Sequence, residues 1–168
     1  MKVIKLALIS FVFLFLMVTV ISLFFPSHVR ISKAIQVNAT REAAMAQISD
    51  PLNWKNWLPG MDTTAVLYVE GKAEGAILNE KTSRFLAITE RKPNEVIAEY
   101  KGIKQRKVIT GWNMLKDSSS NTVTIQWYMD FSLRWYPWEK FSSILFEKQY
   151  GPTMEEGLAK LKKQLENN

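Results

Sequence analysis

Four carboxylates are the residues of this 168-residue sequence best placed for acid–base chemistry. Glu99 and Asp130 fall within predicted strands, and Glu80 and Glu90 are weaker candidates. A general acid or base must lie in a cleft that shifts its pKa, whereas we interpret each of these carboxylates as a solvent-facing strand residue. The sequence therefore shows no catalytic constellation and favours a protein that is not an enzyme, although catalysis by positioning alone stays open.

Other kinds of site are excluded by composition. The sequence has no cysteine, so disulfides, thiolate metal ligands and thiol nucleophiles are excluded. His28 is the only histidine, and it lies at the predicted membrane boundary with no metal partner or nucleophile near it in the sequence. We therefore interpret it as an interfacial residue and expect neither a Ser-His-Asp triad nor a histidine-carboxylate metal cluster. No glycine-rich phosphate loop is present. We therefore expect no metal and no other cofactor.

The charge is modest and the apolar content is high. The net charge of +6 comes from small basic groups mixed with acidic and apolar residues, a pattern typical of a solvated surface, so no nucleic-acid partner is expected. Attraction to anionic lipid headgroups is the weaker alternative. The hydrophobic fraction of 47% and the aromatic fraction of 12% are too high for a disordered chain. The segment after the N-terminal apolar run should therefore fold as one domain.

That apolar run, residues 6–25, contains no charged residue, and as a helix it would be about 30 Å long, the thickness of the hydrocarbon layer. We predict a membrane anchor in residues 1–26, which contacts the bilayer through residues 6–25, followed by a domain in residues 27–168. A cleaved secretory signal is the alternative, but the bulky sequence from Leu23 to Pro26 lacks the small residues of a cleavage site.

The orientation of the anchor follows from basic residues on its two sides. Lys2 and Lys5 precede the apolar run, and Arg30 and Lys33 follow it closely. The leading helix with an upstream basic cluster usually sets the topology. The sequence therefore favours, by a small margin, a single-pass protein whose domain is extracytoplasmic.

The rest of the chain predicts one strand, two short helices, six strands and a final helix. Even spacing of apolar residues over 29–37 indicates the first strand. Thr40 or Asn38 can cap a helix over 41–48, and Asp50 before Pro51 opens a second short helix through Trp57. Six strands follow, separated by turn residues at 70–71, 75, 93–94, 102 and 117–121: Thr64 to Glu70, Ala76 to Lys81, Arg84 to Arg91, Glu95 to Tyr100, Lys107 to Leu115 and Thr122 to Leu133.

The C-terminal region predicts an amphipathic helix. Apolar residues recur at helical spacing over 141–146, and Gly151-Pro152 should interrupt that segment. Thr153 and Glu156 have the spacing of a capping box, so a new helix should begin there, with an apolar stripe that covers the sheet.

Motifs at the two ends of this domain carry a family resemblance. They are Val37-Asn38-Ala39, Glu42 and Asp50-Pro51-x-Asn53-Trp54-x-x-Trp57-x-Pro59 at the start, and Gly151-Pro152-x-Met154-Glu155-x-Gly157-Leu158-x-x-Leu161-Lys162 at the end. With them the sequence resembles the polyketide cyclase/dehydrase and START-like lipid-transfer (SRPBCC, helix-grip) superfamily. The resemblance implies an α+β fold, with a curved antiparallel sheet of about seven strands wrapped on a long C-terminal helix and two short helices after the first strand.

The same resemblance implies an apolar cavity between the sheet and the helix, and it leaves the use of that cavity open. The sequence departs from the family pattern at Thr40, which is often proline, and at Ala44 and Met45, where bulkier residues are usual. The small Ala44 and flexible Met45 could enlarge the cavity. By strand and helix periodicity, we predict these ligand-binding residues: Trp57, Tyr100, Trp112, Trp127, Met129, Phe131, Tyr150, Met154 and Leu158. For each of them the alternative is ordinary core packing.

Three functions remain from the sequence. The favoured one is a membrane-tethered domain that binds a hydrophobic or lipid-like small molecule. The second is a cyclase- or hydrolase-type enzyme that acts on such a ligand. The third is a structural or partner-binding domain whose core is filled.

Overall fold

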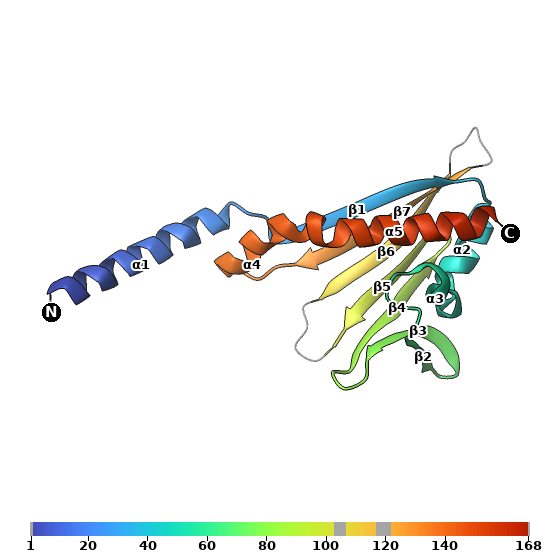
Figure 1. The fold of residues 1–168 in the computed structure, drawn as a ribbon, viewed down its shortest axis with the longest axis horizontal. Coiled ribbons are helices and arrows are strands. Elements are labelled where there is room, and N and C mark those ends of the chain that lie inside the picture. Colours follow the sequence, from blue (N-terminus) through green and yellow to red (C-terminus); the bar gives the residue numbers. More distant parts are fainter. Residues whose placement is uncertain (1, 103–106, 117–121, 168) are drawn as a thin grey trace.

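The computed structural model describes residues 2–102, 107–116 and 122–167 (Figure 1). The predicted turn at 117–121 lies outside the described residues. The elements, in chain order, are α1 (Lys2–Leu23), β1 (His28–Val37), α2 (Arg41–Ser49), η1 (Pro51–Asn53), α3 (Trp54–Trp57), β2 (Ala65–Val69), β3 (Lys72–Asn79), β4 (Arg84–Lys92), β5 (Glu95–Lys101), β6 (Val108–Lys116), β7 (Val123–Ser132), α4 (Pro137–Ser142), η2 (Ser143–Leu145) and α5 (Phe146–Glu166).

The seven strands form one antiparallel sheet in the order β1-β7-β6-β5-β4-β3-β2. Strands β2 to β7 are consecutive neighbours, and β1 joins the far edge by pairing with β7 from His28↔Ser132 to Val37↔Val123. The helix α5 packs against β1, β7 and α3 (Figure 1). The predicted helix-grip fold, with its two short helical segments after the first strand, is therefore confirmed.

Local sequence explains the helix boundaries near β1. Thr40 caps α2 by accepting a hydrogen bond from the Ala43 amide at 3.2 Å. Asp50 caps η1 by accepting from the Leu52 amide at 3.0 Å, and Pro51 occupies the first helical position. Both caps were among those predicted from the sequence.

One predicted turn was wrong. Gly75 lies inside β3, which begins at Lys72, and Gly75 pairs with Ala87 of β4. A Cβ atom on Gly75 would lie 2.0 Å from the Leu86 carbonyl oxygen. The glycine therefore allows the two strands to approach closely, which is a role of glycine different from that in a turn.

The predicted interruption of the C-terminal helix was also wrong. The helix α5 runs from Phe146 through Gly151 and Pro152 to Glu166, so Thr153 lies inside it and does not cap it. Pro152 costs roughly 3 kcal/mol through its lost N–H. Burial of Phe146, Met154 and Leu158 against the sheet contributes about 1.5–3 kcal/mol for each side chain, which offsets that cost.

The N-terminal helix α1 stands apart from the core of the domain. It is long and apolar enough to cross a membrane, a test that a secretory signal also passes. Ser22 is its one buried residue, so α1 is not a core helix. Its last turn approaches α4 (Figure 1).

Candidate functional site

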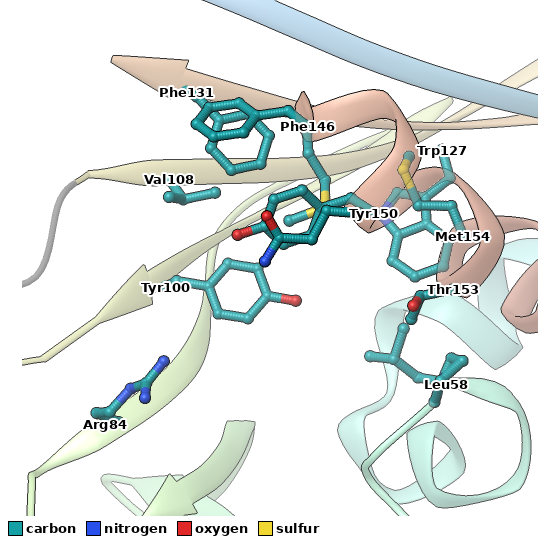
Figure 2. A pocket seen from close by; sticks show the side chains of 13 residues that line it. Leu58, Arg84, Tyr100, Val108, Trp127, Phe131, Phe146, Tyr150, Thr153 and Met154 are labelled. Carbon is teal, nitrogen blue, oxygen red and sulfur yellow. The ribbon is translucent and has the colours of Figure 1, made fainter. Parts of the chain in front are cut away.

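A cavity of about 530 Å³ lies between the N-terminal half of α5 and the middle strands of the sheet (Figure 2). This volume is within the range of roughly 300–1,000 Å³ that is typical of small-molecule sites. The described lining residues are Leu58, Pro59, Arg84, Tyr100, Val108, Trp127, Met129, Phe131, Phe146, Gln149, Tyr150, Thr153 and Met154.

Aromatic rings form one end of the cavity. Phe131 projects from β7, and its ring centroid lies 4.7 Å from that of Phe146 and 5.0 Å from that of Tyr150. Phe146 and Tyr150 are four residues apart on α5, so both face the sheet. This end of the cavity is therefore apolar and lies where α5 begins.

The indole of Trp127 forms part of the wall near the middle of α5, and two contacts fix its position. Its Nε1 donates a hydrogen bond to Oγ1 of the buried Thr110 at 2.7 Å. Gly157 of α5 lies directly against the ring, since a Cβ on Gly157 would be 2.8 Å from Trp127 Cζ3. Glycine at this position therefore lets the helix approach the indole closely.

A cluster of tryptophans fills the space beyond Trp127. The Trp112 ring centroid lies 5.7 Å from that of Trp127 and 5.7 Å from that of Trp57, and Trp54 packs on Trp112 at 5.9 Å. All four indoles are almost fully buried. The cavity therefore occupies only part of the space between sheet and helix.

The charged side chain of the lining lies toward the other end of the cavity. Arg84, on β4, is the charged side chain among the described lining residues, and it lies away from Phe131 and Phe146 (Figure 2). Tyr100 and Tyr150 approach each other from β5 and α5 (Figure 2). Burial, reinforced by the neighbouring Tyr150 hydroxyl, raises the pKa of Tyr100 to about 12. Tyr100 is therefore neutral at physiological pH and can both donate and accept a hydrogen bond.

Six of the nine predicted ligand-binding residues line this cavity: Tyr100, Trp127, Met129, Phe131, Tyr150 and Met154. The other three do not line it. Trp57 and Trp112 belong to the tryptophan cluster, and Leu158 packs in the core one turn beyond Met154, so these three are packing residues here.

Seven lining residues were not predicted. Phe146 could have been found, because it lies four residues before Tyr150 and eight before Met154 on the same side of the helix. Val108 pairs with Phe131 across β6 and β7, so the strand register would also have indicated it. The remaining five have no strong sequence signal: Leu58, Pro59, Arg84, Gln149 and Thr153.

The candidate carboxylates lie outside the cavity. Across β5, β6 and β7, Glu99 pairs with Ile109, and Ile109 pairs with Asp130. The cavity residues Tyr100, Val108 and Phe131 form the neighbouring row of paired residues. Because successive side chains of a strand point to opposite faces, Glu99 and Asp130 lie on the face of the sheet opposite the cavity. Arg30 donates two hydrogen bonds of 2.6 Å each to Asp130.

The other acidic candidates and the histidine do not form a site with them. Glu90 is exposed and lies 3.3 Å from the Lys92 ammonium, and Glu80 lies in an exposed turn. His28 Nδ1 lies 3.5 Å from Ser132 Oγ. Within residues 2–102, 107–116 and 122–167, no group of three or more histidine or acidic side chains could hold a metal ion.

Comparisons with known proteins agree with this geometry. The sequence model of the family described as polyketide cyclase / dehydrase and lipid transport matches residues 28–166. No curated protein matches the sequence significantly.

Solved structures share the fold at low sequence identity. A START superfamily protein from Mycobacterium smegmatis has 17% identity and a TM-score of 0.61, covering 81% of this chain and 96% of that one. A protein from Thermobifida fusca has 12% identity and a TM-score of 0.62, covering 81% and 92%. Truncated norcoclaurine synthase from Thalictrum flavum has 10% identity and a TM-score of 0.59, covering 82% and 92%. These similarities describe the fold and not the activity.

Proposed function

Because the chain belongs to the polyketide cyclase/dehydrase and lipid transport family, we propose that it is a membrane-tethered domain that binds a hydrophobic or lipid-like small molecule between α5 and the sheet. The observation that carries this proposal is the cavity of about 530 Å³, which has an aromatic end and a polar end. A filled core, as expected of a purely structural domain, would leave no such volume.

The lining favours an amphiphile over a purely apolar molecule. Phe131 and Phe146 offer an apolar surface to a hydrocarbon chain. At the other end, Arg84 supplies positive charge and Tyr100 supplies a neutral hydroxyl, both suited to an anionic or polar headgroup. No described lining residue is a carboxylate, which supports binding over acid–base catalysis.

The tether proposed for residues 6–25 would keep the cavity beside a source of such molecules. A domain held at a bilayer meets membrane-derived amphiphiles at high effective concentration. The residues after α1 are integrated into the domain, since Lys140 donates to the Phe25 carbonyl at 2.8 Å and Leu133 donates to the Ser27 carbonyl at 2.8 Å. This integration favours retention of the helix over cleavage as a signal. Lys2 and Lys5 favour an extracytoplasmic domain.

Photolabelling of the full chain in phospholipid vesicles tests the proposal. The probe is a long-chain fatty acid with a diazirine near its methyl end, added to the vesicles, irradiated, and located by peptide mass spectrometry. We expect adducts on the cavity segments of β7 and α5 as well as on α1. Labelled α1 without cavity adducts would contradict ligand binding, whereas an unlabelled α1 would contradict the anchor.

A matched pair of variants distinguishes cavity labelling from random surface labelling. Thr153 lines the cavity from an exposed position on α5, so the larger side chain of Thr153→Trp should fill part of the cavity. Lys160 is exposed two turns further along the same helix and does not line the cavity. We expect Thr153→Trp to lower the ratio of cavity to α1 adducts and Lys160→Trp to leave this ratio unchanged.

A further inference from the structure

An exposed apolar surface lies around α4, at the end of the domain nearest α1 (Figure 1). We call it the α4 surface, and its large exposed members are Trp135, Trp138, Ile144 and Leu145, each about 60% accessible. Tyr136 joins the two indoles, because its ring lies 4.9 Å from that of Trp135 and stacks on that of Trp138 with a centroid distance of 4.8 Å and an interplanar angle of 7°. Domains that face only water seldom expose such a group of large apolar side chains.

Side-chain contacts fix the α4 surface beside the C-terminal end of α1. The buried Lys140 donates hydrogen bonds from Nζ to the Phe25 carbonyl at 2.8 Å and to Ser27 Oγ at 3.2 Å. The ring of Phe141 meets that of Phe25 edge to face at 5.2 Å. Because Phe25 lies two residues after the end of α1, α4 is held at the level where a spanning helix leaves the hydrocarbon layer.

The residue types suit that level of a bilayer. Trp and Tyr are enriched where hydrocarbon meets headgroups, because their rings are apolar and their N–H or O–H groups remain hydrated. Arg134 and Lys148 are exposed on either side of the segment. Basic residues at this depth attract anionic headgroups.

We propose that the α4 surface inserts into the headgroup–acyl boundary of the leaflet from which α1 emerges. This inference rests on the membrane anchor proposed above. The bilayer is favoured over a protein partner because the surface is continuous with α1 and fixed to it through Lys140. The domain is then held by two contacts and has a defined orientation.

This orientation brings the apolar end of the cavity toward the lipid. Leu145 belongs to the α4 surface, and the next residue, Phe146, already lines the cavity with Phe131. An acyl chain that leaves the leaflet beside α4 therefore has a short route into the cavity.

Single-cysteine spin labelling tests the proposal, and the absence of native cysteine means that no background substitution is needed. The full chain in anionic phospholipid vesicles would be labelled at Trp138→Cys or Leu145→Cys. Phe15→Cys in α1 reports on the anchor, and Val69→Cys on the distant strand β2 is the aqueous control, since Val69 is exposed. The measurement is the collision rate of each label with O₂, which concentrates in hydrocarbon, relative to a polar nickel complex, which lipid excludes. Circular dichroism checks that each variant is folded.

We expect the ratio of O₂ to nickel accessibility at both α4 positions to exceed that at Val69→Cys by on the order of tenfold, as apolar and polar solutes partition oppositely. An aqueous ratio at both α4 positions, with a lipid-like ratio at Phe15→Cys, would overturn this inference and leave the anchor intact. Labels at α4 shielded from both reagents would also overturn it, because they would indicate a protein partner or a second copy of the chain. An aqueous ratio at Phe15→Cys would overturn the anchor itself.

Discussion

Trp127 donates a hydrogen bond from its indole Nε1 to Oγ1 of Thr110 over 2.7 Å, and Thr110 in turn donates to the Tyr128 carbonyl over 3.1 Å. All three groups are buried, and the two bonds join β6 to β7 at the wall of the cavity. The orientation of a cavity-lining indole is thus set by hydrogen bonds between two neighbouring strands.

Replacing Thr110 with valine should destabilise the domain. Thr110→Val keeps the shape of the side chain but leaves Trp127 Nε1 buried without its acceptor, at a cost of about 1–3 kcal/mol. The measurement is urea unfolding of the full chain in nonionic micelles, followed by far-ultraviolet circular dichroism. Thr110→Ser retains the hydroxyl, so valine should cost more than serine. Equal losses in the two variants would show that the hydrogen bond contributes little.

Two glycines on α5 should respond differently to alanine. In Gly157→Ala the new methyl would lie 2.8 Å from both Pro59 Cδ and Trp127 Cζ3, and neither ring can yield easily. We expect a loss of about 1–3 kcal/mol. In Gly151→Ala the nearest atoms outside the neighbouring residues, at 3.2 and 3.3 Å, are flexible ends of Lys33 and Glu147. The higher helix propensity of alanine is opposed by the crowding of its methyl group against the following Pro152, so this variant should lose less stability than Gly157→Ala.

The same unfolding experiment compares the two glycine variants. If both lose equal stability, the close approach of Gly157 to Trp127 is not what requires glycine there. If Gly157→Ala is the only destabilised variant, photolabelling should also report a disturbed cavity, since Trp127 lines it.

The sheet could be predicted from the sequence because its signals are local. Apolar residues at every second position of β7 predicted one buried face, and Val123, Ile125, Trp127, Met129 and Phe131 are buried. The burial of Tyr128, on the other face, was not predicted. Gly111 leaves room for its ring, and the Tyr128 hydroxyl donates to Glu95 at 2.8 Å. Two residues on separate strands create that position, and no periodicity within β7 could indicate it.

The cavity was predicted only where it follows periodic elements. Tyr150 and Met154 lie four residues apart on α5, so one helical face indicated both. Pro59 lies in a loop and Arg84 is the first residue of β4, and these two segments come together only in the folded domain. The start of α5 was missed for a related reason, because the local Gly151-Pro152 signal was weaker than the packing of the helix on the sheet.

Tyr100 should make stability fall at alkaline pH. Burial raises its pKa to about 12, while an unfolded tyrosine titrates near 10. Between these values the unfolded chain has lost a proton that the folded chain keeps, so the free energy of unfolding decreases as pH rises. The contribution is fully present below pH 10 and is lost as pH rises through about 12. We expect the wild type to lose about 1–2 kcal/mol more than Tyr100→Phe across this window.

Urea unfolding at a series of pH values measures this difference. Tyr68 is exposed on β2 and provides the control, since Tyr68→Phe should keep the pH dependence of the wild type. If the free energy of unfolding depends on pH in the same way for wild type and Tyr100→Phe, the Tyr100 hydroxyl is as hydrated in the folded domain as in the unfolded chain.

Asp130 should be dispensable for ligand binding. It lies next to Met129 in β7 but faces away from the cavity, where it pairs with the exposed Arg30. Exposed ion pairs contribute roughly 0–1 kcal/mol, so Asp130→Asn should destabilise only slightly and leave fatty-acid photolabelling of the cavity unchanged. Loss of labelling in this variant, with stability maintained, would instead indicate a functional role for the outer face of the sheet.

Lys140 should control how rigidly the domain is held to α1. In Lys140→Met the Phe25 carbonyl and the Ser27 hydroxyl lose their common donor, and a hydrogen bond from a charged donor contributes roughly 1.5–3 kcal/mol. The measurement is the distance distribution between spin labels at Met17→Cys in α1 and Glu156→Cys in α5, by pulsed electron resonance in nanodiscs. Lys140→Met should broaden this distribution.

Lys163→Met is the matched control, because Lys163 is exposed near the other end of α5 and its replacement removes the same charge. It should leave the distribution narrow. If both variants stay narrow, the aromatic contact of Phe25 with Phe141 suffices to orient the domain, and the insertion of the α4 surface should then survive the loss of Lys140. If only Lys140→Met broadens the distribution, Trp138 and Leu145 should also lose their lipid-like accessibility in that variant, because the depth of the α4 surface depends on the hydrogen bond from Lys140 to Phe25.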